Sequence, residues 1–131
     1  IAPNNECIRM NGSGSTPATL TARSVVMQCN ATKYIGTGSF NAAAVQTAFG
    51  SGANNNNDAF TPTLASLFIN GTNENGVAGF DATTIAAWFT KTTYIGAVQN
   101  ASDTWWAGWT CNSSSANFGT SSTACTSLPT T

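Results

Sequence analysis

The stretch WFTKTTYIGAVQNASDTWWAGWTC, from Trp88 to Cys111, decides how the rest of the chain can be interpreted. It holds all four tryptophans and the apolar run Tyr94 to Val98. No other window combines so much apolar mass with so few charges. Large aromatic rings dominate the energetics of both cores and contact surfaces. We therefore expect this stretch to be either the best-packed part of the fold or its principal contact surface.

Composition places the 131 residues in one folded domain. Only nine side chains are charged, four basic and five acidic, whereas about a quarter of an ordinary chain is charged. Disorder is disfavoured because 41% of the residues are hydrophobic and the net charge is −1. Without a basic cluster the chain is not expected to bind nucleic acid or anionic membranes, and no apolar run reaches the ~18 residues that span a bilayer. The chain starts at Ile1 without a signal-like segment, so we expect a mature protein or a fragment.

The cysteines indicate disulfides in an oxidising compartment, and hence an extracellular or cell-surface protein. They are even in number, widely spaced and without a CxxC pair, and the chain has no histidine to complete a mixed metal site. Three pairings are possible. The local pairing closes two short loops at opposite ends of the chain, and a loop of about 15 residues contributes ~3 kcal/mol. The four residues are Cys7, Cys29, Cys111 and Cys125.

The first 80 residues are expected to form strands followed by a helix and polar loops. Residues 1–36 are assigned to strands, of which Thr19 to Cys29 is the clearest because β-branched residues dominate it. Residues 37–80 are assigned to a helix, Ala42 to Phe49, capped by Asn41 and ended by Gly50, and to loops rich in Asn and Gly.

The remainder is expected to close the fold. Residues 81–111 are assigned to a helix over 82–89 capped by Asp81, a buried strand from Tyr94 to Val98, and a tryptophan-rich seal folded back over the sheet. Ile85, Trp88 and Phe89 would share one face of that helix. Residues 112–131 form a tail closed by a disulfide. The resulting class is a mainly β fold with two short helices.

Catalysis is not expected. The absence of histidine removes the usual general base near neutral pH. A glycosidase needs two facing carboxylates, and Asp81 with Asp103 is the pair we consider for a hydrolase. Each acid also has a local structural role available, and these roles are the preferred interpretation. The five acids are Glu6, Asp58, Glu74, Asp81 and Asp103.

Two oxygen-rich loops, 54–58 and 70–75, are the weak candidates for calcium. Each contains one carboxylate and neither has the spacing of an EF-hand, so solvated turns are the preferred interpretation and no cofactor is expected. Five Asn-x-Ser/Thr sequences begin at Asn11, Asn30, Asn70, Asn100 and Asn112.

Trp105, Trp106 and Trp109, with Tyr94 as support, are the candidate ligand or partner contacts. Flat aromatic faces stack on sugar rings, and indole N–H groups donate to a polar rim. Consecutive tryptophans on an extended segment point to opposite faces, so one of Trp105 and Trp106 would face outward. The preferred interpretation is that the rings plug the end of the domain, and a sugar platform is the alternative.

A family resemblance lies in the order of RSVVMQC, NAAAVQTAF, FTPTLASLFINGTNENGVAGFD, WFTKTTYIGAV and DTWWAGWTC. It resembles the C-terminal region of large secreted or cell-surface bacterial proteins whose upstream part is similar to a right-handed parallel β-helix. The resemblance runs from Thr19 to Cys111 and is clearest from Tyr94 to Thr110, with a YIGA-type strand and a WxxGWT-type ending. It implies the last rungs and cap of a β-helix, with a small β-sandwich-like domain as the other architecture, and it carries no catalytic residues.

These observations predict a non-catalytic extracellular structural or adhesive module. It would act as the cap of a surface protein or as a subunit that associates with itself in a fibre or filament. The low charge favours close packing of copies, because little charge must be desolvated. The alternative is a carbohydrate-binding module using the exposed tryptophans. Expected partners are therefore a second copy, a neighbouring surface protein or glycans.

Overall fold

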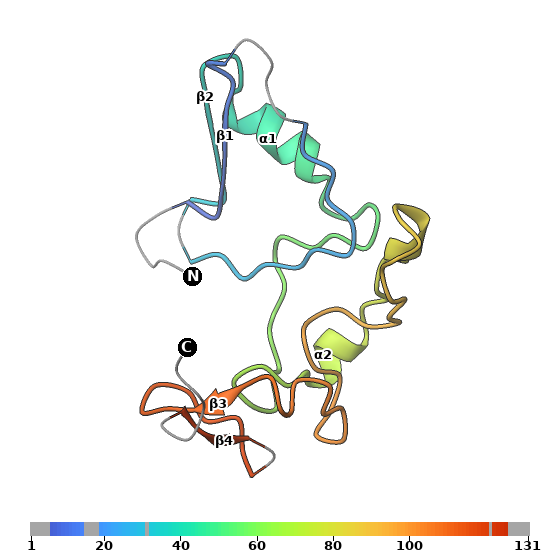
Figure 1. The fold of residues 1–131 in the computed structure, drawn as a ribbon. Helices are drawn as coiled ribbons and strands as arrows, with labels where there is room; N and C mark the ends of the chain where they lie inside the picture. Colours follow the sequence, from blue (N-terminus) through green and yellow to red (C-terminus); the bar gives the residue numbers. More distant parts are fainter. Residues whose placement is uncertain (1–5, 15–18, 31, 121, 126–131) are drawn as a thin grey trace. The chain divides into compact units, whose positions relative to one another are not determined.

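The computed structural model describes residues 6–14, 19–30, 32–120 and 122–125. The chain forms two compact units, Ile1–Gln99 and Asn100–Thr131, which we describe separately (Figure 1). The boundary falls inside the Trp88 to Cys111 stretch, so that stretch is divided between the units. The outermost parts of the expected strand region and closing tail, 1–5 and 126–131, lie outside the described residues.

The structure confirms a small, mostly non-helical fold with two short helices, short strands and two disulfides. Both disulfides follow the local pairing, Cys7 with Cys29 and Cys111 with Cys125. No helix in the described residues is long and apolar enough to cross a membrane. The first unit contains β1 (Ile8–Asn11), β2 (Tyr34–Thr37), α1 (Ala42–Phe49), α2 (Thr72–Asn75) and the 3-10 turn η1 (Ala82–Thr84), and the second contains β3 (Cys111–Asn112) and β4 (Thr123–Ala124).

Helix α1 forms where local sequence signals predict it. The Asn41 side chain accepts a hydrogen bond from the Ala44 N–H at 2.8 Å, which satisfies one of the free donors of the first turn. Gly50 ends the helix in the left-handed conformation, with φ of 64°. Val45 and Phe49, four residues apart, are buried on one side.

The core of the first unit lies between α1 and the parallel pair β1–β2, which runs in register from Ile8 opposite Tyr34 to Asn11 opposite Thr37. The Tyr34 and Phe49 rings lie 5.9 Å apart. The disulfide of Cys7 ties the start of β1 to residue 29. Buried members of this core are Ala22, Tyr34, Val45 and Phe49, and Ile8, Met10, Leu20, Met27 and Phe40 pack against them partly buried.

The expected strand from Thr19 to Cys29 is wrong as a continuous element. The segment makes one parallel bridge, between Val26 and Asn57. Ser24 has φ of 55°, a left-handed conformation that turns the chain out of the extended path. The β-branched composition therefore produces an extended segment with a kink, and not a ladder.

The expected strand from Tyr94 to Val98 is also interrupted. Tyr94 bridges Ala78 in antiparallel fashion and Val98 bridges Ile69 in parallel fashion. Between them Gly96 adopts φ of 83°, which separates the two bridges. Val98 is nonetheless fully buried, as expected for an apolar run.

The expected helix over 82–89 is reduced to the single turn η1. Its cap is confirmed, because the Asp81 side chain accepts the Thr83 N–H at 3.1 Å. A helix of eight residues is marginal on its own, and three consecutive β-branched residues, Thr83, Thr84 and Ile85, disfavour it further. Ile85 and Trp88 are exposed and do not form the expected buried face.

The second unit is a short closed loop. Strands β3 and β4 pair in parallel, with Cys111 opposite Thr123 and Asn112 opposite Ala124. The Asn112 side-chain amide donates to the carbonyl oxygens of Gly119 and Ser122, each at 3.0 Å. Because a unit of this size buries little apolar surface, the disulfide and these polar contacts contribute much of its closure.

Candidate functional site

Strand β1 presents one of its edges away from β2. The Ile8 N–H donates to the Lys33 carbonyl at 3.0 Å, and the Gly12 N–H donates to the Thr37 carbonyl at 2.9 Å. In a parallel ladder the residues between such donors direct their N–H groups to the opposite side, which places those of Arg9 and Asn11 on the outer edge. Within the described ranges each strand of this pair has one neighbour.

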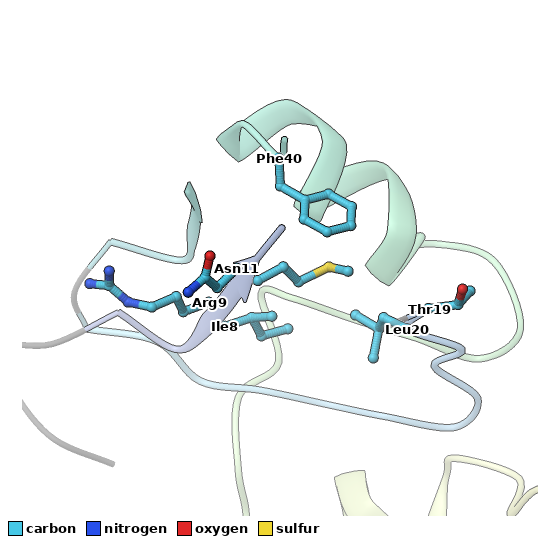
Figure 2. Close-up of a pocket in the computed structure, with 7 residues that line it drawn as sticks. Ile8, Arg9, Asn11, Thr19, Leu20 and Phe40 are labelled. Atoms are coloured by element: carbon cyan, nitrogen blue, oxygen red, sulfur yellow. The ribbon is translucent and has the colours of Figure 1, made fainter. Parts of the chain in front are cut away.

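A cavity of 290 Å³ runs beside β1, and Figure 2 shows the side chains around it. The Arg9 side chain is bound to the Glu6 carboxylate, and the hydrogen bond from Arg9 lowers the pKa of Glu6. The apolar side chains next to it are continuous with the core of the first unit. The cavity is lined by Ile8, Arg9, Met10, Asn11, Thr19, Leu20 and Phe40.

The tryptophans do not form one seal. Trp106 is 8% exposed, whereas Trp105 is 62% and Trp109 is 87% exposed. Trp88, in the first unit, is 78% exposed and stacks on Phe89 with ring centroids 3.9 Å apart. The core-plug interpretation therefore holds for Trp106 and is wrong for Trp105 and Trp109.

Trp106 anchors the second unit. Its indole N–H donates to the Asp103 carbonyl at 3.1 Å, and its ring lies 6.0 Å from the Phe118 ring. The Trp106 carbonyl accepts the Trp109 N–H at 3.1 Å and the Thr110 hydroxyl at 3.2 Å. These contacts hold the turn that carries Trp105 and Trp109 outward.

Tyr94 does not belong with this group, because it lies in the first unit and is half buried at its bridge to Ala78. The candidate contact residues of the second unit are thus Trp105 and Trp109. Tyr94 therefore does not support Trp105 and Trp109 from within the second unit.

The loop over 54–58 is not simply solvated, because Asn56 is 3% exposed. Its side-chain amide donates to the carbonyl oxygens of Ala22 at 2.9 Å and Phe49 at 2.8 Å. Its side-chain oxygen accepts the Val25 N–H at 3.0 Å. One side chain therefore joins its own loop to the end of α1 and to the distant segment 22–25, and it satisfies three backbone groups.

Asn70 and Glu74 play a similar role in the loop over 70–75, and both are buried. The Glu74 carboxylate accepts the Thr63 N–H at 2.8 Å, the Thr63 hydroxyl at 3.0 Å and the Gly71 N–H at 3.0 Å. Burial raises the pKa of Glu74, but these hydrogen bonds outweigh burial and hold the pKa below its ordinary value. The Asn70 side chain donates to the Ile95 carbonyl at 2.6 Å, so the asparagine of this Asn-x-Thr sequence is part of the interior.

The carboxylates of the first unit are all engaged by neighbouring groups. Asp58 accepts the Tyr34 hydroxyl at 2.8 Å and the Ser51 hydroxyl at 2.9 Å, and the bond from Tyr34 is the main cause of its lowered pKa. Burial, with the Asp58 carboxylate beside it, raises the pKa of Tyr34. Asp81 pairs with Lys91 at 2.8 Å, and its expected catalytic partner Asp103 belongs to the other unit.

A metal centre has no support in the described part of the chain, which contains no group of three or more Cys, Asp or Glu side chains arranged to hold an ion. In each of the two loops considered for calcium, the carboxylate is bound to protein groups, Asp58 to Tyr34 and Ser51 and Glu74 to Thr63 and Gly71.

Sequence reasoning missed the structural asparagines, because residue type gives no sign of which Asn in a polar run is buried. The sequence did contain a signal for the two pairing segments, in the form of a short internal repeat. Residues 32–36, TKYIG, recur as TTYIG over 92–96. The first copy forms β2 and the second makes the bridge at Tyr94, so both copies contribute pairing to the same unit.

Comparison with known proteins adds no assignment: the chain matches no family model, no curated protein and no solved structure.

Proposed function

We propose that the protein is a non-catalytic extracellular contact module that associates edge to edge, through β1, with a second copy or with a neighbouring surface protein. The observation that carries the proposal is the parallel pair β1–β2, whose outer edge is paired with no other described strand. Parallel sheets are normally found in larger sheets covered on both faces, and an isolated two-stranded sheet is marginal in water.

The arrangement of bridges in the first unit supports a rung-like architecture. Besides β1–β2, the first unit pairs Val26 with Asn57 and Ile69 with Val98 in parallel. Parallel pairings between segments about 26 to 31 residues apart are what successive turns of a β-helix or solenoid would make. On this proposal the chain is the last turns and cap of such a body. An end turn of this kind accepts another strand by edge addition.

The two disulfides and the exposed apolar side chains support the same role. Two disulfides favour an oxidising environment outside the cytosol. Large apolar side chains are exposed in both units, where a partner can contact them. The exposed large apolar residues are Val25, Leu64, Leu67, Ile85, Trp88, Trp105 and Trp109.

Replacing Arg9 by proline tests the proposal. Proline removes an N–H on the outer edge but leaves the N–H groups that bond β2 in place. We expect sedimentation velocity of the non-reduced protein to show association that rises with concentration, and Arg9→Pro to weaken it at least tenfold. Arg9→Ala, which keeps the N–H, should associate like the unchanged protein. A protein that stays monomeric at every concentration would contradict the proposal, as would Arg9→Pro associating normally.

A second candidate function, carbohydrate binding, is favoured by the exposure of Trp105 and Trp109 on one turn of the second unit. Neutral polysaccharides that stack on these rings should quench tryptophan fluorescence by tens of per cent, and Trp105→Ala combined with Trp109→Ala should abolish the response. Trp88→Ala, at an exposed ring of the other unit, is the matched control. Unchanged fluorescence across a panel of neutral polysaccharides would retire this candidate.

A further inference from the structure

Two adjoining hollows of 420 and 410 Å³ in the first unit share Thr21, Arg23 and Phe80. The first is mostly polar, with Ser24, Asn54, Asn55 and Asp81 among its lining residues. The second is lined in addition by the apolar side chains of Val25 and Ile85. Neither hollow involves β1 or the tryptophans of the second unit.

The walls of the larger hollow come from three chain segments held together by direct hydrogen bonds. The Ser24 N–H donates to the Asn54 carbonyl at 2.9 Å, and the Ser24 hydroxyl donates to the Ala78 carbonyl at 2.8 Å. The Asn55 side-chain amide reaches the same Ala78 carbonyl at 3.4 Å. Hydrogen bonds between distant segments therefore build the site, and no single loop forms it alone.

Backbone conformation marks the same place. Within the described ranges, the non-glycine residues with positive φ are Ser24, Asn54 and Asn55, at 55°, 52° and 59°. All three line the larger hollow. Asparagine adopts this conformation at little cost, but serine does so at a real one, and such costs concentrate at binding sites.

Arg23 is the distinctive group of this site. Of the four basic side chains, Arg9, Lys33 and Lys91 form ion pairs with described carboxylates, and Arg23 forms none. Its guanidinium carbon lies over the Phe80 ring, 4.7 Å from the ring centre, and this cation–π contact favours keeping the group over the aromatic face. A guanidinium held in this way presents its paired N–H donors to a carboxylate in a fixed geometry.

We propose that this hollow binds a uronic-acid residue of an acidic polysaccharide. The sugar carboxylate pairs with the Arg23 guanidinium, and the ring hydroxyls hydrogen-bond to the amides of Asn54 and Asn55. The neighbouring apolar wall accepts the C–H face of the ring. Asp81 does not oppose the bound carboxylate strongly, because Lys91 lies 2.8 Å from it and the Thr83 N–H donates to it.

The side chains around Arg23 favour a sugar over an acidic peptide as the source of the carboxylate. Hydroxyl and amide groups that exchange donors and acceptors with a polyhydroxylated ring surround it, namely those of Thr21, Ser24, Asn54 and Asn55. The site does not depend on association through β1, so either proposal can fail without the other.

Titration of the full, non-reduced protein with trigalacturonate, followed by NMR, tests the site. We expect saturable shifts at the amides of Arg23, Asn54 and Phe80, with affinity for galactotriose at least tenfold weaker. Arg23→Gln should weaken trigalacturonate binding about tenfold, which corresponds to about 1.4 kcal/mol. Arg9→Gln removes the same charge from an arginine paired with Glu6 and should leave the affinity unchanged.

One further variant and two comparison ligands distinguish this proposal from its alternatives. Arg23→Lys keeps the charge but loses the planar fork, so we expect an intermediate loss, and this variant serves if Arg23→Gln fails to fold. Equal binding of galactotriose would overturn the carboxylate role of Arg23. Triglutamate binding as tightly as trigalacturonate would overturn the sugar assignment. No binding of trigalacturonate, or an equal loss in Arg9→Gln, would overturn the site itself.

Discussion

Replacing Asn56 by alanine is expected to lower the free energy of unfolding of the first unit by about 4 kcal/mol. The change leaves the carbonyl oxygens of Ala22 and Phe49 and the N–H of Val25 without their partner. Each buried polar group left unsatisfied costs ~1–3 kcal/mol. Small domains have ~5–15 kcal/mol in total, so the variant should lose a large part of its stability.

Urea unfolding followed through the methyl resonances of Val45, which is fully buried in the first unit, measures this loss. The control is Asn57→Ala, the neighbouring residue of the same type. Asn57 is exposed, and its side-chain oxygen accepts one N–H, that of Ala59 at 2.8 Å, so its loss should cost less than about 1 kcal/mol. Equal costs for the two asparagines would show that the buried bonds of Asn56 do not hold the unit together.

Replacing Trp106 by alanine is expected to cost the second unit about 3–5 kcal/mol, the usual range for emptying the site of a buried aromatic ring. The change also removes the indole N–H bond to the Asp103 carbonyl and the packing on Phe118. A unit that depends on one ring and one disulfide should then lose its order. The side-chain amide of Asn112, bound to Gly119 and Ser122, should show this as fast hydrogen exchange.

Trp109→Ala is the matched control, since the ring is 87% exposed and surface substitutions usually change stability by less than ~0.5 kcal/mol. In the unchanged protein, the Trp106 indole proton should exchange more slowly than the indole protons of the exposed rings. If Trp109→Ala disrupts the unit as much as Trp106→Ala does, or if Trp106→Ala leaves Asn112 protected, the anchoring role of Trp106 is wrong.

Local signals predicted local structure well. Helix α1 begins after Asn41 and ends at Gly50, as expected, because its caps and its buried pair Val45 and Phe49 lie within ten residues. The Asp81 cap also forms, but the helix after it stops at one turn. There the β-branched residues that follow the cap, and the lack of a core against the expected face, outweighed the capping signal.

Long-range arrangement was not predicted. The strands expected over Thr19 to Cys29 and Tyr94 to Val98 became separate bridges, because single residues, Ser24 and Gly96, take left-handed conformations set by contacts elsewhere in the unit. The polar wall of the Arg23 site was missed for a related reason. Its three segments, around Ser24, Asn54 and Ala78, meet through hydrogen bonds between positions more than 20 residues apart.

Composition and local spacing were sufficient for the general class of the protein, with its low charge, its cystines and its capped helix, because each depends on residue type or on neighbours in the chain. Only the tertiary structure decided which rings and amides are inside. Trp105 and Trp106 are adjacent and chemically identical, yet Trp106 is buried against Phe118 and Trp105 is exposed. Likewise Asn56 is buried within a run of four asparagines. Burial depends on which distant segments pack against a residue, and residue type alone does not specify those segments.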